Sequence, residues 1–461
     1  MPGFTRTLIR TRYLIAASSA AALTAAVVMT ASPAMAWQAP AFWVSPTATP
    51  AGADLNCNTA AYSTVQSAVT AAEAVETLHR GEVPTVDICP GTYSEQLTIA
   101  DSVTLTRAPV PASLGPVTIQ LPAAVGSNQS TGLSSTTCQA QDAATSTQVP
   151  QSVIEVCGAG SGVQVTVNDL TVAGDWPSSV CYDSLYGILV GGGASLSLTG
   201  STVERIGAYP LNGCQGGVGV EIGSAPTGQV GHATLRGDTV ETYQKNGITV
   251  DGPGSSATIE NVTVTGAGAT PTIAQNGIQI SFGATASVTS STVTGNNYTG
   301  TGVASSAGIL VYGGGGTVCG VGANSPLVRN AVFTGNQLFG NDIGIAFFNT
   351  DPTCTKSPST PTRDTACGNT IENNHGYPSA DANITGFSST VGYQAGISDT
   401  GNRDVICSNY ILGAGYAPRD ATRSLPNPPP PAFVRPIDIV SEAAIAPAVF
   451  GNTYDGMPYT P

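Results

Sequence analysis

Basic residues and histidines are both scarce in this chain, and each shortage argues against a class of protein. Charged residues make up only 10% of the 461 residues, and 29 acidic residues outnumber 15 basic ones. Because an acidic protein repels polyanions, nucleic acid and anionic lipid are poor candidate partners. The three histidines, His79, His232 and His375, lie far apart in the sequence and lack a second ligand at metal spacing. We therefore expect no zinc site.

Several catalytic and binding motifs are also missing. The chain has no Gly-x-Ser-x-Gly elbow, and its glycine runs do not lead from a strand into a helix as a phosphate-binding loop does. Neither an EF-hand loop nor the calcium-binding nonapeptide occurs. We expect no cofactor, and calcium remains only as an ion that could lie between outward-facing acids.

One long apolar run is present, at the N-terminus, where it follows Arg6, Arg10 and Arg12. It ends at Ala34-Met35-Ala36, a small-x-small pattern typical of signal-peptide cleavage. An uncleaved membrane anchor is the alternative, because the run approaches the length that spans a bilayer. Without residues 1–36 the chain keeps 12 basic and 29 acidic residues, a net charge of −17. We expect a secreted monomer with no membrane segment after cleavage.

The ten cysteines include no Cys-x-x-Cys pair, which in an exported chain is typical of disulfides rather than of a metal or redox centre. Proximity in the sequence suggests three bridges: Cys57 with Cys89, Cys138 with Cys157, and Cys181 with Cys214. The pairing within the other two bridges stays open, among Cys319, Cys354, Cys367 and Cys407.

A phrase of glycine, an aliphatic residue, any residue and a second aliphatic residue recurs along the chain. The phrases begin 32, 28, 30, 31 and 36 residues apart, at Gly187, Gly219, Gly247, Gly277, Gly308 and Gly344. Periods of this size indicate a solenoid, whose units bury their apolar sides only by stacking on one another. The phrases are β-branched and alternate with period two, which predicts strands. The predicted fold class is all-β, a parallel β-helix.

A second strand phrase follows in each unit, as in "SLSLTGSTV" and "SATIENVTV", with apolar residues at every second position. The bend after it is occupied in successive units by residue types that tolerate a left-handed backbone, namely Asp169, Gly200, Gly237, Asn261 and Ser290. Each coil should lay three short strands and then rise about 4.8 Å to the next coil.

The region before the repeats predicts an N-terminal capping helix, because "STVQSAVTAAEAVETLHR" carries Val65, Ala68, Val69 and Ala72 on one face. Helix, strand, "PGTY", Glu95 and short alternating strands resemble the opening of right-handed β-helix proteins of the pectin-lyase-like superfamily. The later Gly-Ile units resemble carbohydrate-associated and NosD-type repeats. The resemblance covers about residues 57–411 and specifies the fold more closely than the reaction, since the superfamily includes lyases, hydrolases, esterases and non-enzymes.

The expected organisation has four parts. A signal peptide occupies residues 1–36, a linker residues 37–56, the β-helix residues 57–411 and a proline-rich tail residues 412–461. The tail contains "SLPNPPPPAFVRP", a stiff extended segment. We expect it to run along the solenoid or to cap its last coil, and a linker to a separate partner is the alternative.

In pectin-lyase-like enzymes the substrate groove lies on the first parallel sheet, and the resemblance assigns the Gly-Ile strands to that sheet. Glu221 and Asp251 face outward on neighbouring coils, offset by two residues, so their Cα atoms should lie about 8 Å apart. This separation suits a carboxylate pair that hydrolyses a glycosidic bond with inversion, one acid protonating the leaving oxygen and the other activating water. The alternative is that two acids occur by chance on a polar face.

Four further residues complete the predicted site. Gln279, one coil on, is a candidate to bond a sugar hydroxyl, and Tyr312 either stacks on a sugar ring or is buried under a loop. Lys245 and Arg205, in loops that lead to this face, are candidates to neutralise a uronate carboxylate or to act as a lyase base. The Asp-Asp, Gly-His-Gly and Arg-x-Lys motifs of polygalacturonases are absent.

Two functions follow. In the first, the protein binds, and in its stronger form cleaves, an extracellular polysaccharide or cell-surface glycan along the Gly-Ile strands. In the second, it is a non-catalytic structural or adhesion module. A groove with clustered acids, an amide and an aromatic residue favours the first, and a flat face of serine and threonine favours the second. The sequence leaves both the activity and the polysaccharide open.

Overall fold

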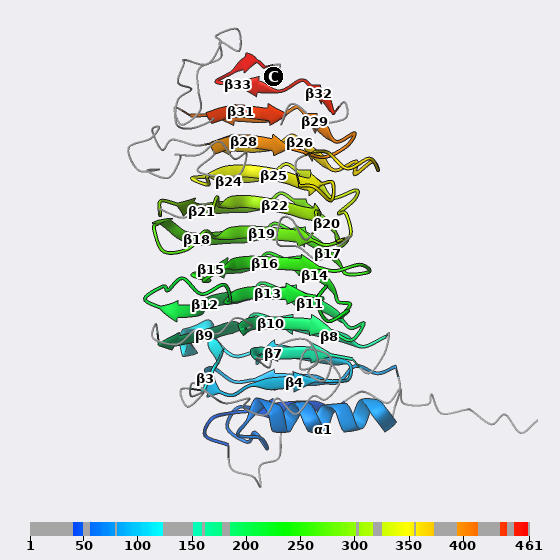
Figure 1. The fold of residues 1–461 in the computed structure, drawn as a ribbon. Helices are drawn as coiled ribbons and strands as arrows, with labels where there is room; N and C mark the ends of the chain where they lie inside the picture. The colour runs from blue at the N-terminus through cyan, green and yellow to red at the C-terminus, as the bar shows by residue number, and fades with distance from the viewer. Residues whose placement is uncertain are drawn as a thin grey trace, which may run out of the picture. The chain divides into compact units, whose positions relative to one another are not determined.

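The computed structural model describes most of the chain after residue 39, namely residues 40–48, 56–78, 81–122, 151–158, 162–177, 185–300, 304–316, 325–354, 356–372, 394–413, 434–439 and 447–459. The expected signal peptide lies outside these residues. Within them, the strands stack coil on coil in three sheets (Figure 1). No helix in the described ranges is both long and apolar enough to cross a membrane.

The sheet built from the Gly-Ile phrases is called sheet C. In the described part of the chain its strands are β4 (Leu97–Ile99), β7 (Gln151–Cys157), β10 (Leu185–Gly191), β13 (Val218–Ile222), β16 (Asn246–Asp251), β19 (Asn276–Ser281), β22 (Ala307–Gly314), β25 (Ile343–Thr350), β28 (Gln394–Asp399) and β31 (Val434–Ile439).

The sheet that follows it in each coil is called sheet A. Its described strands are β1 (Ala41–Val44), β2 (Thr85–Ile88), β5 (Val103–Arg107), β8 (Gln164–Asn168), β11 (Ser195–Thr199), β14 (His232–Arg236), β17 (Ser256–Glu260), β20 (Thr285–Thr289), β23 (Val332–Thr334), β26 (Thr365–Cys367), β29 (Val405–Cys407) and β32 (Ala448–Phe450).

The third sheet is called sheet B. Its described strands are β3 (Gly91–Ser94), β6 (Val117–Gln120), β9 (Thr171–Pro177), β12 (Thr202–Tyr209), β15 (Thr239–Glu241), β18 (Thr263–Thr270), β21 (Thr292–Tyr298), β24 (Gln337–Phe339), β27 (Thr370–Glu372), β30 (Tyr410–Leu412), β33 (Thr453–Tyr454) and β34 (Met457–Pro458). Only β33 and β34 pair antiparallel among the described strands.

The aliphatic residues of the Gly-Ile phrases form an internal file. Parallel pairing in sheet C places them directly above one another, and all are fully buried: Ile188, Val220, Ile248, Ile278 and Ile309. Each coil thus covers the apolar side chains of its neighbour, which is the main source of stability in a solenoid. The predicted parallel β-helix is confirmed.

The bend between sheets A and B has the backbone that its residues predict. At five successive bends φ is positive, between 51° and 66°, at Asp169, Gly200, Gly237, Asn261 and Ser290. A short polar side chain or a glycine tolerates this left-handed conformation better than a β-branched residue does. The bend residue therefore fixes where sheet A ends and sheet B begins.

The N-terminal cap is helix α1 (Val65–Leu78), and its buried residues are the predicted Val65, Ala68, Val69 and Ala72. Glu95 caps this helix from the first coil, because its carboxylate accepts the N–H groups of Val65 and Gln66 at 2.8 and 3.0 Å. The carboxylate satisfies two amides that have no partner inside the helix and opposes the positive end of the helix dipole. A short 3₁₀ helix spans Ala112–Leu114.

Two disulfides join described residues. The predicted bridge between Cys57 and Cys89 is confirmed, and a second bridge joins Cys367 and Cys407, which occupy paired positions on β26 and β29. Three more cysteines are disulfide-bonded, namely Cys157, Cys214 and Cys354. The remaining cysteines of the predicted bridges, Cys138, Cys181 and Cys319, lie outside the described residues.

Near the C-terminal end, a ladder of buried asparagines lies just after the bends between sheets A and B. Its members are Asn336, Asn369, Asn409 and Asn452, and each Oδ1 after the first accepts the backbone N–H and the Nδ2–H of the preceding member at 2.9–3.0 Å. Beyond residue 411, β31, β32 and β33 join sheets C, A and B. The strand pairing therefore continues through one more coil.

Candidate functional site

The outer face of sheet C places the two predicted acids as the register requires. Glu221 pairs with Thr249 on the next strand, and Asp251 lies two residues beyond Thr249. Both acids are only 7% exposed, so they do not line an open groove. Neither acid borders the two hollows on sheets A and C that are described below.

The side chain of Asp251 is held by protein groups on both oxygens. Its Oδ1 accepts a hydrogen bond from Ser281 Oγ, and its Oδ2 accepts the Ala225 N–H, each at 2.7 Å. Burial raises the pKa of Asp251, while these bonds and the Gly252 N–H oppose the rise. A raised pKa is the property that a general acid needs, but a substrate reaches this carboxyl only if the segment around Ala225 moves.

Gln279 belongs to an amide network rather than to an open groove. Its Oε1 accepts from the Nδ2 groups of Asn246 and Asn276 at 3.2 and 3.4 Å, and its Nε2 donates to Ser281 Oγ at 3.2 Å. Ser281 in turn donates to Asp251. The network ties the coils of β16 and β19 together on the outer face and fixes the amide of Gln279, which stays partly exposed.

The two predicted cations make different contacts within the fold. Lys245 precedes β16 and donates from Nζ to the carbonyl of Ala274 at 2.9 Å, and burial lowers its pKa. Arg205 lies within β12 of sheet B, where φ is 54° and the pairing shifts register, and its Nε lies 3.4 Å from the carboxylate of Glu204. Arg205 is thus part of a bulged strand in sheet B and not of a loop leading to sheet C.

Three aromatic side chains form a ladder on successive coils of sheet C. Tyr312 stacks on Phe348 with ring centroids 5.7 Å apart and planes within 5°, and it meets Phe282 edge-on at 5.3 Å. Tyr312 and Phe348 occupy paired positions on β22 and β25, and Phe282 follows β19 directly. All three rings are partly exposed. We call these three residues the aromatic ladder.

A hollow of about 600 Å³ begins one step beyond the aromatic ladder on the same strands. Gly314 and Thr350, two residues after Tyr312 and Phe348, belong to its lining. Its rim carries charged side chains that are not among the predicted ligands, namely Arg329, Lys356 and Asp351. Arg329 and Lys356 are exposed. We call this the ladder hollow.

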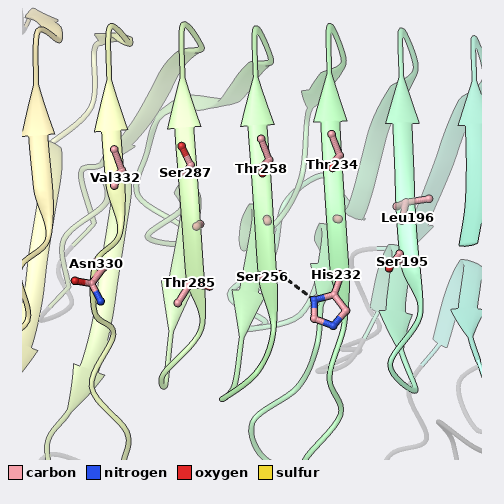
Figure 2. A pocket seen from close by; sticks show the side chains of 13 residues that line it. Ser195, Leu196, His232, Thr234, Ser256, Thr258, Thr285, Ser287, Asn330 and Val332 are labelled. Carbon is pink, nitrogen blue, oxygen red and sulfur yellow. Dashed lines mark hydrogen bonds between the residues drawn. The ribbon is translucent and has the colours of Figure 1, made fainter. Parts of the chain in front are cut away.

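A second hollow, of about 430 Å³, crosses the outer face of sheet A over β11, β14, β17, β20 and β23. Figure 2 shows its polar side chains in two rows across the strands. His232 and Ser256 belong to the same row, and His232 Nδ1 lies 2.8 Å from Ser256 Oγ. Among the described residues, no group of three or more acidic, histidine or cysteine side chains is placed to hold a metal ion.

Sequence reasoning reached part of the ladder and missed the hollow. Tyr312 was found because it continues the outward column of the repeat, whereas Phe282 lies one residue past its strand, where φ is 48°. Arg329 and Lys356 lie in connections whose sequence does not repeat from coil to coil, so equivalent positions of the repeats do not include them. The available signal for Arg329 and Lys356 was that both are basic residues in a chain with few lysines.

Comparison with known families agrees with this geometry. Residues 144–320 match the family model described as "Right handed beta helix region". Together with the three parallel sheets, this match defines the class: the chain is a right-handed parallel β-helix protein. No curated protein sequence matches the chain.

Similar solved structures include a complex of XylC with xylose, with 10% identity, a TM-score of 0.46, and coverage of 81% of this chain and 69% of that one. The pectate lyase Pel9A aligns with 14% identity, a TM-score of 0.43, and coverage of 92% and 82%. The A-module of the Azotobacter vinelandii mannuronan C-5 epimerase AlgE6 aligns with 15% identity, a TM-score of 0.34, and coverage of 85% and 94%.

Proposed function

We propose that this protein is a secreted polysaccharide-binding β-helix, and that a sugar chain lies over the aromatic ladder and enters the ladder hollow. The observation that carries the proposal is the position of three partly exposed rings next to a hollow of about 600 Å³. Cavities of this size are typical of ligand sites. The C–H groups of a sugar pack well on exposed aromatic surface, and its hydroxyl groups need polar partners nearby.

The rim of the hollow supplies such partners. Arg329 and Lys356 donate only, and Asp351 accepts, so the site offers both kinds of hydrogen bond to hydroxyl groups. Neither basic side chain forms an ion pair within the described part of the chain. Their charge is therefore available to a ligand. The extracellular setting is inferred from the N-terminal sequence and supported by the disulfides.

Hydrolysis at Glu221 and Asp251 is a second candidate function, and the raised pKa of Asp251 favours it. In that mechanism Asp251 protonates the leaving oxygen and Glu221 activates water. The substrate has to displace the Ala225 N–H from Asp251 Oδ2, because that contact now closes the carboxyl. Binding at the ladder needs no such movement, so it is the function that we place first.

Binding is tested by titrating the wild-type protein with a panel of extracellular polysaccharides and repeating the titration with Tyr312→Ala. We expect about a tenfold loss of affinity, since removing one aromatic contact costs about 1–2 kcal/mol. Tyr410→Ala is the control, because Tyr410 is an exposed ring on sheet B, away from the ladder. Equal affinity of Tyr312→Ala and the wild type would remove the ladder from the binding site.

Cleavage is tested separately on the same panel by measuring release of reducing ends and of unsaturated products. We expect Asp251→Asn and Glu221→Gln to abolish any activity that the wild type has, while binding at the ladder persists. Activity that survives both substitutions would mean that the acid pair is not catalytic.

A further inference from the structure

The hollow on sheet A is a separate feature from the ladder hollow on sheet C. Its floor is made by strand residues whose side chains turn into the core: Leu196, Ala233, Ala257 and Ala286. Because these side chains point inward and lie in register on neighbouring strands, the backbone lies open between the polar rows on either side. We call this feature the sheet A trough.

Its walls are two rows of polar side chains, seen in Figure 2. One row contains Ser195, His232, Ser256 and Thr285, and the other contains Thr234, Thr258 and Ser287, which the strand register places in line. The rows are two residues apart along each strand, or about 7 Å, and four strand spacings make the trough about 19 Å long. These dimensions suit one extended chain that crosses the strands.

The hydroxyl groups of the trough are largely uncommitted. His232 and Ser256 bond to each other at 2.8 Å. The other hydroxyl groups form no side-chain hydrogen bond with any described residue. They belong to Ser195, Thr234, Thr258, Thr285 and Ser287. A hydroxyl group both donates and accepts hydrogen bonds, so the two rows match a ligand whose groups also donate and accept.

The charge of the trough restricts its ligand further. No lysine, arginine, aspartate or glutamate lines it, and the nearest charged pair along the strands, Arg236 and Glu260, is an ion pair at 3.3 Å. The chain carries a net charge of −14, which disfavours a polyanion. Without a cation in the lining, nothing offsets that repulsion.

A peptide strand is also disfavoured. The strands β14, β17 and β20 each pair on both sides, so their backbone groups are already bonded within the sheet. Adding a strand requires a free sheet edge, and the trough lies in the interior of the sheet. The remaining match is a linear polymer that carries hydroxyl groups and no charge.

We propose that the sheet A trough binds a single chain of a neutral polysaccharide, with the sugar hydroxyl groups bonded to its two polar rows. The proposal rests on the carbohydrate association proposed above and adds a second binding surface and the chemical class of its ligand. The chain lies along the solenoid axis, across β11 to β23. The polysaccharide contacts the exposed backbone of the floor. Its hydroxyl groups replace water as the hydrogen-bond partners of the hydroxyl groups in the walls.

The test is the double variant Thr234→Val/Thr258→Val, which keeps side-chain shape and removes two hydroxyl groups. Its control is Thr263→Val/Thr292→Val, the same change at paired outward positions on sheet B. Both are titrated with a neutral β-glucan and with polygalacturonate beside the wild type and Tyr312→Ala. We expect about a tenfold loss of neutral-glucan affinity in the trough variant and none in the control, with melting temperatures of both within 2 °C of the wild type.

Each outcome decides the proposal. A wild type that binds neither polymer overturns this inference, whereas the proposed function is decided separately by the titration with the full polysaccharide panel. A wild type that binds polymer and loses affinity only through Tyr312→Ala leaves the proposed function standing and overturns the trough. Equal losses in the trough variant and the control also overturn it, as does binding of polygalacturonate alone.

Discussion

Three carboxyl groups are buried together where sheet C turns into sheet A near the C-terminal end. Asp399 ends β28, while Asp364 and Asp404 precede β26 and β29, and all three residues are fully buried. Asp404 Oδ1 accepts from Thr362 Oγ1 at 2.6 Å, and Asp364 Oδ2 accepts from Asn349 Nδ2 at 2.8 Å. No ion pair reaches them from any described residue. We call them the acid corner.

Burial raises the pKa of every member of the acid corner, and the charge of Asp404 raises the values of Asp364 and Asp399 further. Because these pKa values are higher in the folded than in the unfolded chain, the fold favours the protonated forms. Their contribution to stability is therefore complete below about pH 4, the ordinary value for aspartate, and is lost as pH rises through the folded values. The C-terminal coils should be more stable in acid than in base.

The perturbation that tests this is Asp399→Asn, which keeps the shape of the side chain and removes its charge. Each pKa difference of one between folded and unfolded states is worth about 1.4 kcal/mol, and two unit charges 4 Å apart repel by about 4 kcal/mol at an effective dielectric constant of 20. We expect a gain of about 1–3 kcal/mol at pH 8 and almost none at pH 4. This corresponds to roughly 2–8 °C in melting temperature.

The assay is a series of thermal melts from pH 4 to pH 9 on the wild type, Asp399→Asn and Asp169→Asn. Asp169 is a suitable control because its side chain is 69% exposed and asparagine tolerates its left-handed backbone. Wild-type melting temperature should fall with pH, and Asp399→Asn should flatten that fall while the control keeps it. A wild-type curve that rises toward pH 8, or an Asp399→Asn curve that coincides with the control, would refute the reasoning.

Three further predictions concern the coil itself. Asn369→Ala should destabilise the fold by about 2–4 kcal/mol, since it leaves buried partners unsatisfied in the asparagine ladder; hydrogen exchange at β24 and β30 checks it. Gly247→Ala should lower soluble yield and melting temperature, because a Cβ there would lie 2.6 Å from Val264 Cγ1 inside the coil. Glu95→Gln should lower the stability of α1 by about 0.5–2 kcal/mol, seen as faster proteolysis of the N-terminal cap and not of later coils.

Most of the fold could be predicted because each coil repeats the same local chemistry. Ile248 and Ile278 lie one above the other because they occupy the same position in successive Gly-Ile phrases. Gly237 and Asn261 bend the chain because both residue types tolerate positive φ. The asparagine ladder also has a signal, a recurring Gly-Asn or Ser-Asn pair before the sheet B strands, as at Asn369. It was missed because a single polar residue at a bend is also common in loops.

The site was less predictable because its surroundings do not repeat. Register alone placed Glu221 and Asp251 correctly relative to each other, yet nothing in the repeat indicates that Ala225 covers Asp251. The position of Arg205 depends on a bulge in β12, which shifts it away from the expected loop. Burial by irregular connections is a tertiary effect that period and propensity do not encode.

The central claim is that a sugar chain contacts the aromatic ladder, and hydroxyl-radical footprinting measures that contact directly. With a saturating oligosaccharide from the polymer that binds best, oxidation of Tyr312 and Phe348 should fall several-fold, while oxidation of Tyr410, 43% exposed on sheet B, stays constant. Unchanged oxidation of both ladder rings in the bound state would contradict the account.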